Sequence, residues 1–77
     1  MKRDGWITDV NGLWILRFRY DWHSWDQNPK VLIEKGRLEV NGPPLLKNRK
    51  KMRRTIAIKL WKELLSTGWR RVHPQWD

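Results

Sequence analysis

Apolar and polar residues alternate through much of the first forty positions, which is typical of β-strands with one buried face. Asn11-Gly12 interrupts this alternation and predicts a hairpin, because both residues tolerate the positive φ of a type I′ turn. With that turn, Ile7 lies opposite Leu16 on the face expected to form the core. Trp6 lies opposite Arg17 on the other face, where we expect a cation–π contact. The predicted core face carries these side chains: Ile7, Trp14, Leu16, Phe18 and Tyr20.

A second hairpin is predicted within residues 30–40, again from alternating apolar and polar positions. A two-residue turn at Lys35-Gly36 places Glu34 opposite Arg37, a favourable cross-strand pair of charges. Residues 1–40 are therefore interpreted as two β-hairpins. Proline cannot donate a backbone hydrogen bond, so residues 41–54 are interpreted as a stiff Pro-Pro turn that leads into a run of basic residues.

The period of the apolar positions changes to that of a helix near the middle of the second half, which predicts an amphipathic helix over residues 52–68. Asn48 and Thr55 are the candidate N-cap residues. Gly68 is the expected C-cap glycine. The predicted apolar face of the helix carries these residues: Ile56, Ala57, Leu60, Trp61 and Leu64.

A short strand is predicted at residues 69–73, and Pro74 ends it or confines it to a sheet edge. Taken together, these elements predict one α+β domain spanning residues 1–77. Its core would be a small antiparallel sheet of four to five strands, with one amphipathic helix packed on one face.

Composition limits what such a domain can be. A chain of 77 residues buries only about 60% of its unfolded surface, but seven tryptophans, each burying about 150–250 Å², partly offset this. Cysteine is absent, which excludes disulfides and thiolate metal sites. Neither a signal-peptide pattern nor an apolar stretch near the ~20 residues of a membrane span is present. We therefore expect a cytoplasmic protein with no membrane contact.

Positive charge is concentrated in the second half of the chain. Residues 1–40 carry seven Lys/Arg and six Asp/Glu, whereas residues 41–77 carry ten Lys/Arg and two Asp/Glu, so +8 of the formal charge of +9 lies there. Residues 47–54 alone contain six cations in eight positions, just before the predicted helix. A helix N-terminus carries about +0.5 of a charge and favours acids, so the run works against local stability and indicates an anionic partner. The alternative interpretation is a solvated run of charges that serves solubility.

Two groups of residues form the predicted anion or partner site. The basic residues are Lys47, Arg49, Lys50, Lys51, Arg53, Arg54, Arg70 and Arg71. Trp22, Trp25 and Trp76 are aromatic residues that strand or helix periodicity does not explain. They are possible contacts for bases or for a protein interface, or else lids on the edge of the core.

Residues that could carry out catalysis or hold a metal form no recognised motif. His23 lies between Asp21 and Asp26, which could suggest a general base or a loose metal site. His73 is fifty positions away, and no ligand spacing connects the two histidines. Because Asp and Ser in loops commonly bond their own backbone, we interpret this segment as a polar loop. The sequence therefore predicts no catalytic residues, no metal site, no cofactor and no enzymatic activity.

Several motifs together resemble a known family. They are Gly5-Trp6, the Asn11-Gly12-x-Trp14 hairpin, Pro43-Pro44-Leu45-Leu46-Lys47, Ala57-x-x-Leu60-Trp61-x-x-Leu64, Gly68-Trp69-Arg70 and Pro74-Gln75-Trp76. In this combination the chain is similar to a family of short proteins of unknown function from marine cyanobacteria and their phages. The resemblance implies a small stand-alone protein in a bacterial cytosol and brings no activity. Arg53, Arg54 and Thr55 depart from it, because similar sequences carry an acidic or small polar residue in the first helical turn.

Two functions are compatible with these features. The first is binding to nucleic acid, either RNA or DNA, or to a ribonucleoprotein, because phosphate is the usual counter-charge for so dense a basic run. The second is a regulatory role, for a protein that is either host- or phage-encoded, in which it docks on an acidic protein surface and modulates a host enzyme or complex. A structural subunit of a larger assembly is a third possibility. The sequence leaves the oligomeric state open.

Overall fold

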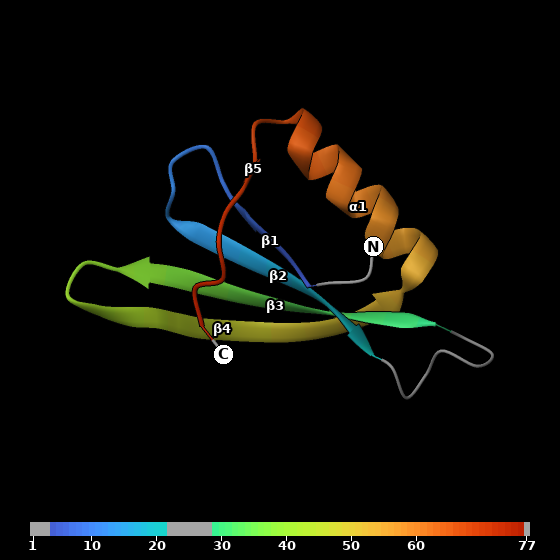
Figure 1. The fold of residues 1–77 in the computed structure, drawn as a ribbon, viewed down its shortest axis with the longest axis horizontal. Helices are drawn as coiled ribbons and strands as arrows, with labels where there is room; N and C mark the ends of the chain where they lie inside the picture. Colours follow the sequence, from blue (N-terminus) through green and yellow to red (C-terminus); the bar gives the residue numbers. More distant parts are fainter. Residues whose placement is uncertain (1–3, 22–28, 77) are drawn as a thin grey trace.

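The computed structural model describes residues 4–21 and 29–76. It contains the following elements: β1 (Gly5–Thr8), β2 (Trp14–Asp21), β3 (Lys30–Glu39), β4 (Gly42–Arg53), α1 (Arg54–Ser66) and β5 (Arg70–Arg71). The strands form a five-stranded sheet in the order β4-β3-β2-β1-β5, and each neighbouring pair is antiparallel. One face of the sheet carries α1 (Figure 1). The predicted α+β class and the number of strands are confirmed.

The first hairpin has the predicted register with a different turn. Ile7 pairs with Leu16 and Trp6 pairs with Arg17, as expected. Among the described residues only glycines have positive φ, so Asn11 does not adopt the conformation of a type I′ turn, whereas Gly12 has φ of 70°. Instead, the Asp9 carboxylate accepts hydrogen bonds from the backbone N–H groups of Leu13 and Trp14 at 2.8 and 3.2 Å. This side-chain cap closes a longer loop without shifting the pairing.

The second hairpin turns later than predicted. β3 runs without interruption through Lys35-Gly36, and the chain reverses at residues 40–41, where Glu39 pairs with Gly42. Glu34 therefore faces Arg17 on β2 and Arg49 on β4, and the expected pair with Arg37 is not formed. The longer strand is favoured because β3 pairs along both of its edges. A turn at Lys35-Gly36 would have removed the backbone hydrogen bonds of its second half.

Residues 41–54, interpreted above as a Pro-Pro turn and basic run, are largely the edge strand β4. Pro43 and Pro44 are accommodated because an edge strand needs hydrogen bonds on one side only. The ladder with β3 also shifts register between Arg37 and Glu39, next to the two prolines. The basic residues from Arg49 to Arg53 are extended and pair with β3, and only Arg54, the last residue of the run, lies in the helix.

α1 lies within the predicted range but starts without a side-chain cap. Its N-cap residue is Arg53, so neither Asn48 nor Thr55 caps it, and no acidic residue lies in its first turn. Gly68, with φ of 108°, ends the helix as predicted, and the Trp69 N–H donates to the Leu64 carbonyl at 3.1 Å. The electrostatic conflict between the basic run and the helix N-terminus is therefore present in the folded protein.

The main core lies between α1 and the sheet. It consists of these buried residues: Ile7, Leu16, Phe18, Val31, Ile33, Ala57 and Trp61. The rings of Phe18 and Trp61 meet edge to face, with centroids 5.0 Å apart. Two predicted core residues differ from expectation: Ile56 is exposed on the helix, and Trp14 lies outside this cluster. Instead, the Lys35 Nζ atom lies over the Trp14 ring, 4.4 Å from the ring centroid.

The conformation of Gly68 provides a test of the helix end. Alanine at this position is expected to lower the free energy of unfolding by about 1–3 kcal/mol, because a residue with a side chain is strained at φ of 108°. Its Cβ would also lie 2.6 Å from the Val10 Cγ2 atom. Gly42→Ala is the matched control, since nothing lies within 4 Å of its added Cβ, and it is expected to change stability by less than about 1 kcal/mol. Urea denaturation would contradict the assignment if both variants had the same midpoint.

Candidate functional site

Strand alternation divides the basic run of β4 between the two faces of the sheet. Cross-strand partners project to the same face, and Lys50 pairs with Ile33, so Lys50 lies on the face that carries α1. Arg49, which pairs with Glu34, projects to the other face together with Lys51 and Arg53. We call this second face, across β2, β3 and β4, the open face. The open face includes the side chains of Arg17, Arg19, Lys30, Leu32, Glu34, Arg49, Lys51 and Arg53.

A buried carboxylate lies at the centre of the open face. Glu34 is only 2% exposed, and its Oε2 atom forms an ion pair with the Arg49 Nε atom at 3.0 Å. Its Oε1 atom lies 3.5 Å from Arg17 Nη1 and 3.9 Å from Arg19 Nη1. A buried charge is tolerated only when it is paired, and this cluster of guanidinium groups provides the pairing. The carboxylate thereby draws arginines from β2 and β4 toward the central strand.

Positive charge on the open face exceeds the negative charge that pairs with it. Arg17 pairs with two carboxylates, because Asp4 as well as Glu34 contacts it. Asp4 accepts hydrogen bonds from the Arg17 Nε and Nη2 atoms at 2.9 and 2.6 Å. Among the described residues, Arg19 and Arg49 both pair with Glu34, and their side chains stay 47% and 61% exposed. Each guanidinium has five N–H donors, so both retain donors that can reach a ligand. The arrangement suits recognition of a polyanion.

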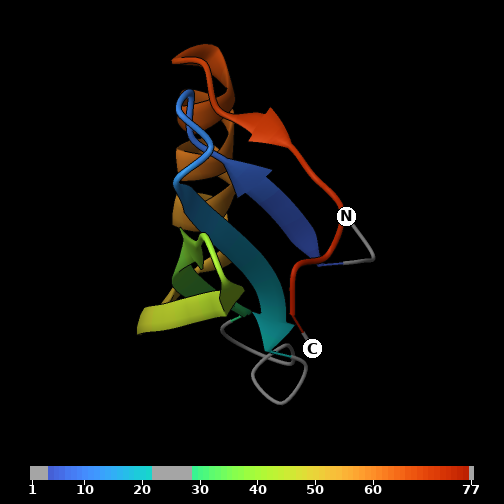
Figure 2. The same ribbon diagram turned by 90° about the vertical axis from the view of Figure 1, so that its left-hand side faces the viewer.

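An aromatic side chain from the C-terminal segment borders the open face. Trp76 packs edge to face on Trp6 with ring centroids 4.5 Å apart, and a Cβ added to Gly36 would lie 3.0 Å from its ring. Trp6 is buried beneath it and makes the predicted cation–π contact with Arg17, at 5.0 Å from the ring centroid. The segment after β5 therefore runs on the side of the sheet opposite α1 (Figure 2).

The structure brings only part of the predicted site together. Arg49, Lys51 and Arg53 share the open face, whereas Lys50 projects to the opposite side. Lys47 falls at a register shift, because Lys35 pairs with Asn48 and the next residue of β3, Gly36, pairs with Leu46. The sequence prediction omitted Arg17 and Arg19. The register of the first hairpin could have identified them, because it places alternate residues of β2 on the face of Trp6.

The remaining predicted residues lie elsewhere. Arg54 is the first residue of α1. Arg70 and Arg71 form β5 at the other edge of the sheet, four inter-strand spacings or about 19 Å from β4. Arg71 there lies over the ring of Trp61, 5.9 Å from its centroid. The predictions for Trp22 and Trp25, as for His23, concern positions outside the described residues.

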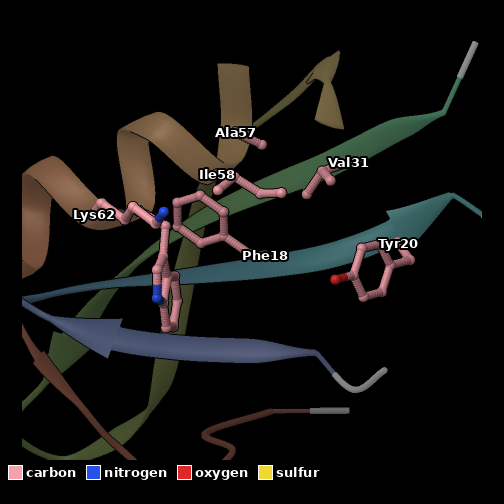
Figure 3. Close-up of a pocket in the computed structure, with 7 residues that line it drawn as sticks. Phe18, Tyr20, Val31, Ala57, Ile58 and Lys62 are labelled. Carbon is pink, nitrogen blue, oxygen red and sulfur yellow. The ribbon is translucent and has the colours of Figure 1, made fainter. Parts of the chain in front are cut away.

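A separate apolar cavity of about 200 Å³ opens between α1 and the sheet. Figure 3 shows Phe18 and Val31 from the strands and Ala57 and Ile58 from the helix around it. Lys62 is the one charged residue among its described lining residues. Its described lining residues are mostly apolar and include no acid–base pair, as at an incompletely filled edge of the core.

The described part of the chain comprises residues 4–21 and 29–76. No group of three or more His, Asp or Glu side chains in this part of the chain is arranged to hold a metal ion. The one helix of that part, α1, is too short and too polar to cross a membrane.

Comparison with known proteins places the chain in a family. Neither curated proteins nor solved structures gave a significant match. A family model described as "Protein of unknown function (DUF1651)" matches residues 4–76, which is nearly the whole chain and includes every element of the fold. The protein therefore belongs to the DUF1651 family of proteins of unknown function.

Proposed function

We propose that the protein is a small, non-enzymatic nucleic-acid-binding protein, or part of a ribonucleoprotein, and that the open face is its contact surface. The observation that carries the proposal is the alternation of Arg49, Lys51 and Arg53 along β4, opposite Arg17 and Arg19 across β3. Two strands thus contribute cations to one face, although alternation directs Lys50 of the run to the other face.

The spacing of these cations suits a phosphate backbone. Alternate residues along a strand are about 6.6–6.8 Å apart, and neighbouring strands are about 4.8 Å apart, so the open face presents a regular two-dimensional array of charge. Arginine binds phosphate through two parallel N–H donors, which makes Arg19 and Arg49 better phosphate ligands than exposed lysines. Because the Glu34 carboxylate already holds Arg49 through Nε, less side-chain entropy remains to be lost on binding.

Oligonucleotide binding at two salt concentrations tests the proposal. Fluorescence anisotropy with labelled RNA and DNA of about 20 nucleotides is expected to give a Kd well below 10⁻⁴ M at about 50 mM salt. If about four phosphates are neutralised, affinity should fall by roughly 50-fold or more at about 200 mM salt. A Kd weaker than about 10⁻⁴ M at low salt, or an affinity insensitive to salt, would overturn the proposal.

A second candidate is a regulator that docks on an acidic protein surface, and a different observation favours it. The β3–β4 hairpin extends beyond the other elements (Figure 1), and Val40 near its tip is 97% exposed, with Leu45 and Leu46 at 50% and 38%. Exposed apolar residues beside cations are compatible with a protein interface. The resemblance to cyanobacterial and phage proteins fits a host-directed regulator in a bacterial cytosol. A stoichiometric protein partner captured from nuclease-treated cyanobacterial lysate, together with absence of oligonucleotide binding, would favour this candidate.

A further inference from the structure

Cationic side chains reach toward the central strand of the open face from both sides. Glu34 of β3 is buried and Gly36 has no side chain, whereas Lys30 and the partly buried Leu32 also project from β3 on this face. β2 and β4 both neighbour β3, so the two arginines of β2 and the cations of β4 form two rows on strands about 10 Å apart. The guanidinium groups of Arg17, Arg19 and Arg49 converge from these rows on the Glu34 carboxylate. The strip of β3 between them is lined on both sides by groups that bind phosphate.

Trp76 closes one end of this strip. The ring lies against Gly36, the only residue of β3 without a side chain, and meets Trp6 edge to face. It is partly exposed, so part of its surface is accessible beside the cationic rows. A tryptophan held by such packing is a preorganised platform on which a base can stack, and stacking platforms beside basic surfaces are the means by which proteins bind single strands.

We propose that the ligand of the open face is a single-stranded nucleic acid, which extends along β3 over the two cationic rows and stacks a base on Trp76. This inference rests on the proposed function and specifies its ligand. A single strand can direct its phosphates to both rows and its unstacked bases to the tryptophan. In a duplex the bases are stacked and paired, and so cannot reach the ring without unpairing.

The test compares single-stranded and duplex forms of one sequence. Mixed-sequence RNA and DNA 12-mers, as single strands and as duplexes of the same length, are titrated into the full chain by anisotropy, with polyglutamate as a non-nucleic polyanion. The single strands are expected to bind at least 10-fold more tightly than the duplexes and than polyglutamate. Duplex binding that equals or exceeds single-strand binding would overturn this inference and leave the proposed function intact. Failure of every nucleic acid to bind would overturn both.

A variant of Trp76 separates stacking from charge. Trp76→Leu retains an apolar group over Trp6 and removes the aromatic face, and it is expected to weaken single-strand binding by about 5- to 100-fold. Duplex affinity and the salt dependence should stay within twofold of the parent chain, because no cation has been removed. Trp69→Leu is the matched control, since Trp69 packs against the core cluster on the side of α1. A folded Trp76→Leu variant, with unchanged far-UV circular dichroism, that binds single strands like the parent would overturn the inference.

Discussion

Replacing Trp61 with alanine is expected to lower the free energy of unfolding by about 3–5 kcal/mol. Trp61 is 8% exposed and is the larger of the two buried side chains that α1 contributes to the core. Its removal would leave a large cavity and would end the edge-to-face contact with Phe18 at 5.0 Å. A chain of 77 residues has a total stability of about 4–12 kcal/mol, so this change would leave the fold marginal.

Trp14→Ala is the matched control for this experiment. Trp14 is partly exposed, lies outside the main core and contacts the Lys35 ammonium 4.4 Å from its ring centroid. Its loss should cost about 1 kcal/mol, the value of an exposed cation–π contact with some loss of packing. Urea denaturation followed by far-UV circular dichroism measures both variants. Equal losses of stability would contradict a core organised around the helix tryptophan.

Neutralising the open face is expected to reduce nucleic-acid affinity by about 100-fold at low salt. The variant is Arg19→Gln, Arg49→Gln and Arg53→Gln together, and the estimate assigns about 1 kcal/mol to each phosphate contact. The slope of log affinity against log salt should become shallower by about 2 for single strands, because three phosphate contacts are lost.

The control for the open-face variant removes the same charge from the other side of the molecule. Lys50→Gln, Lys59→Gln and Lys62→Gln change one β4 residue on the face of α1 and two residues of α1 itself. Affinity is expected to fall less than fivefold, since only the long-range field changes. Lys50 is the informative position, because it lies between two open-face residues in the sequence and projects away from them in the fold. Equal effects of the two triple variants would indicate binding through net charge alone.

Local chemistry was sufficient to predict some elements. The register of the first hairpin follows from alternation on both sides of Asn11-Gly12, because a shift of one residue would expose Ile7 and Leu16. The end of α1 follows from Gly68, whose positive φ only glycine adopts without strain. In both cases the local conformation depends on the conformational preferences and burial of a few adjacent residues.

The second hairpin and the basic run could not be predicted in this way. Lys35-Gly36 and residues 40–41 are both acceptable places to turn, and the choice depends on whether β3 has partners along its full length. Once β3 extends through Gly36, the basic run becomes its neighbour and is extended as well. Both outcomes depend on long-range pairing between strands, which no local window contains.

The sequence by itself therefore determined the class of the fold, the first hairpin, the helix and the excess of positive charge. Only the tertiary structure decided where that charge lies. It placed Arg49 with Arg17 and Arg19 around the buried Glu34 and Arg53 on the same face, directed Lys50 to the opposite side, and placed β5 at the far edge of the sheet. The physical reason is that side chains alternate along a strand, so adjacent cations separate, while pairing between strands gathers cations distant in sequence onto one surface.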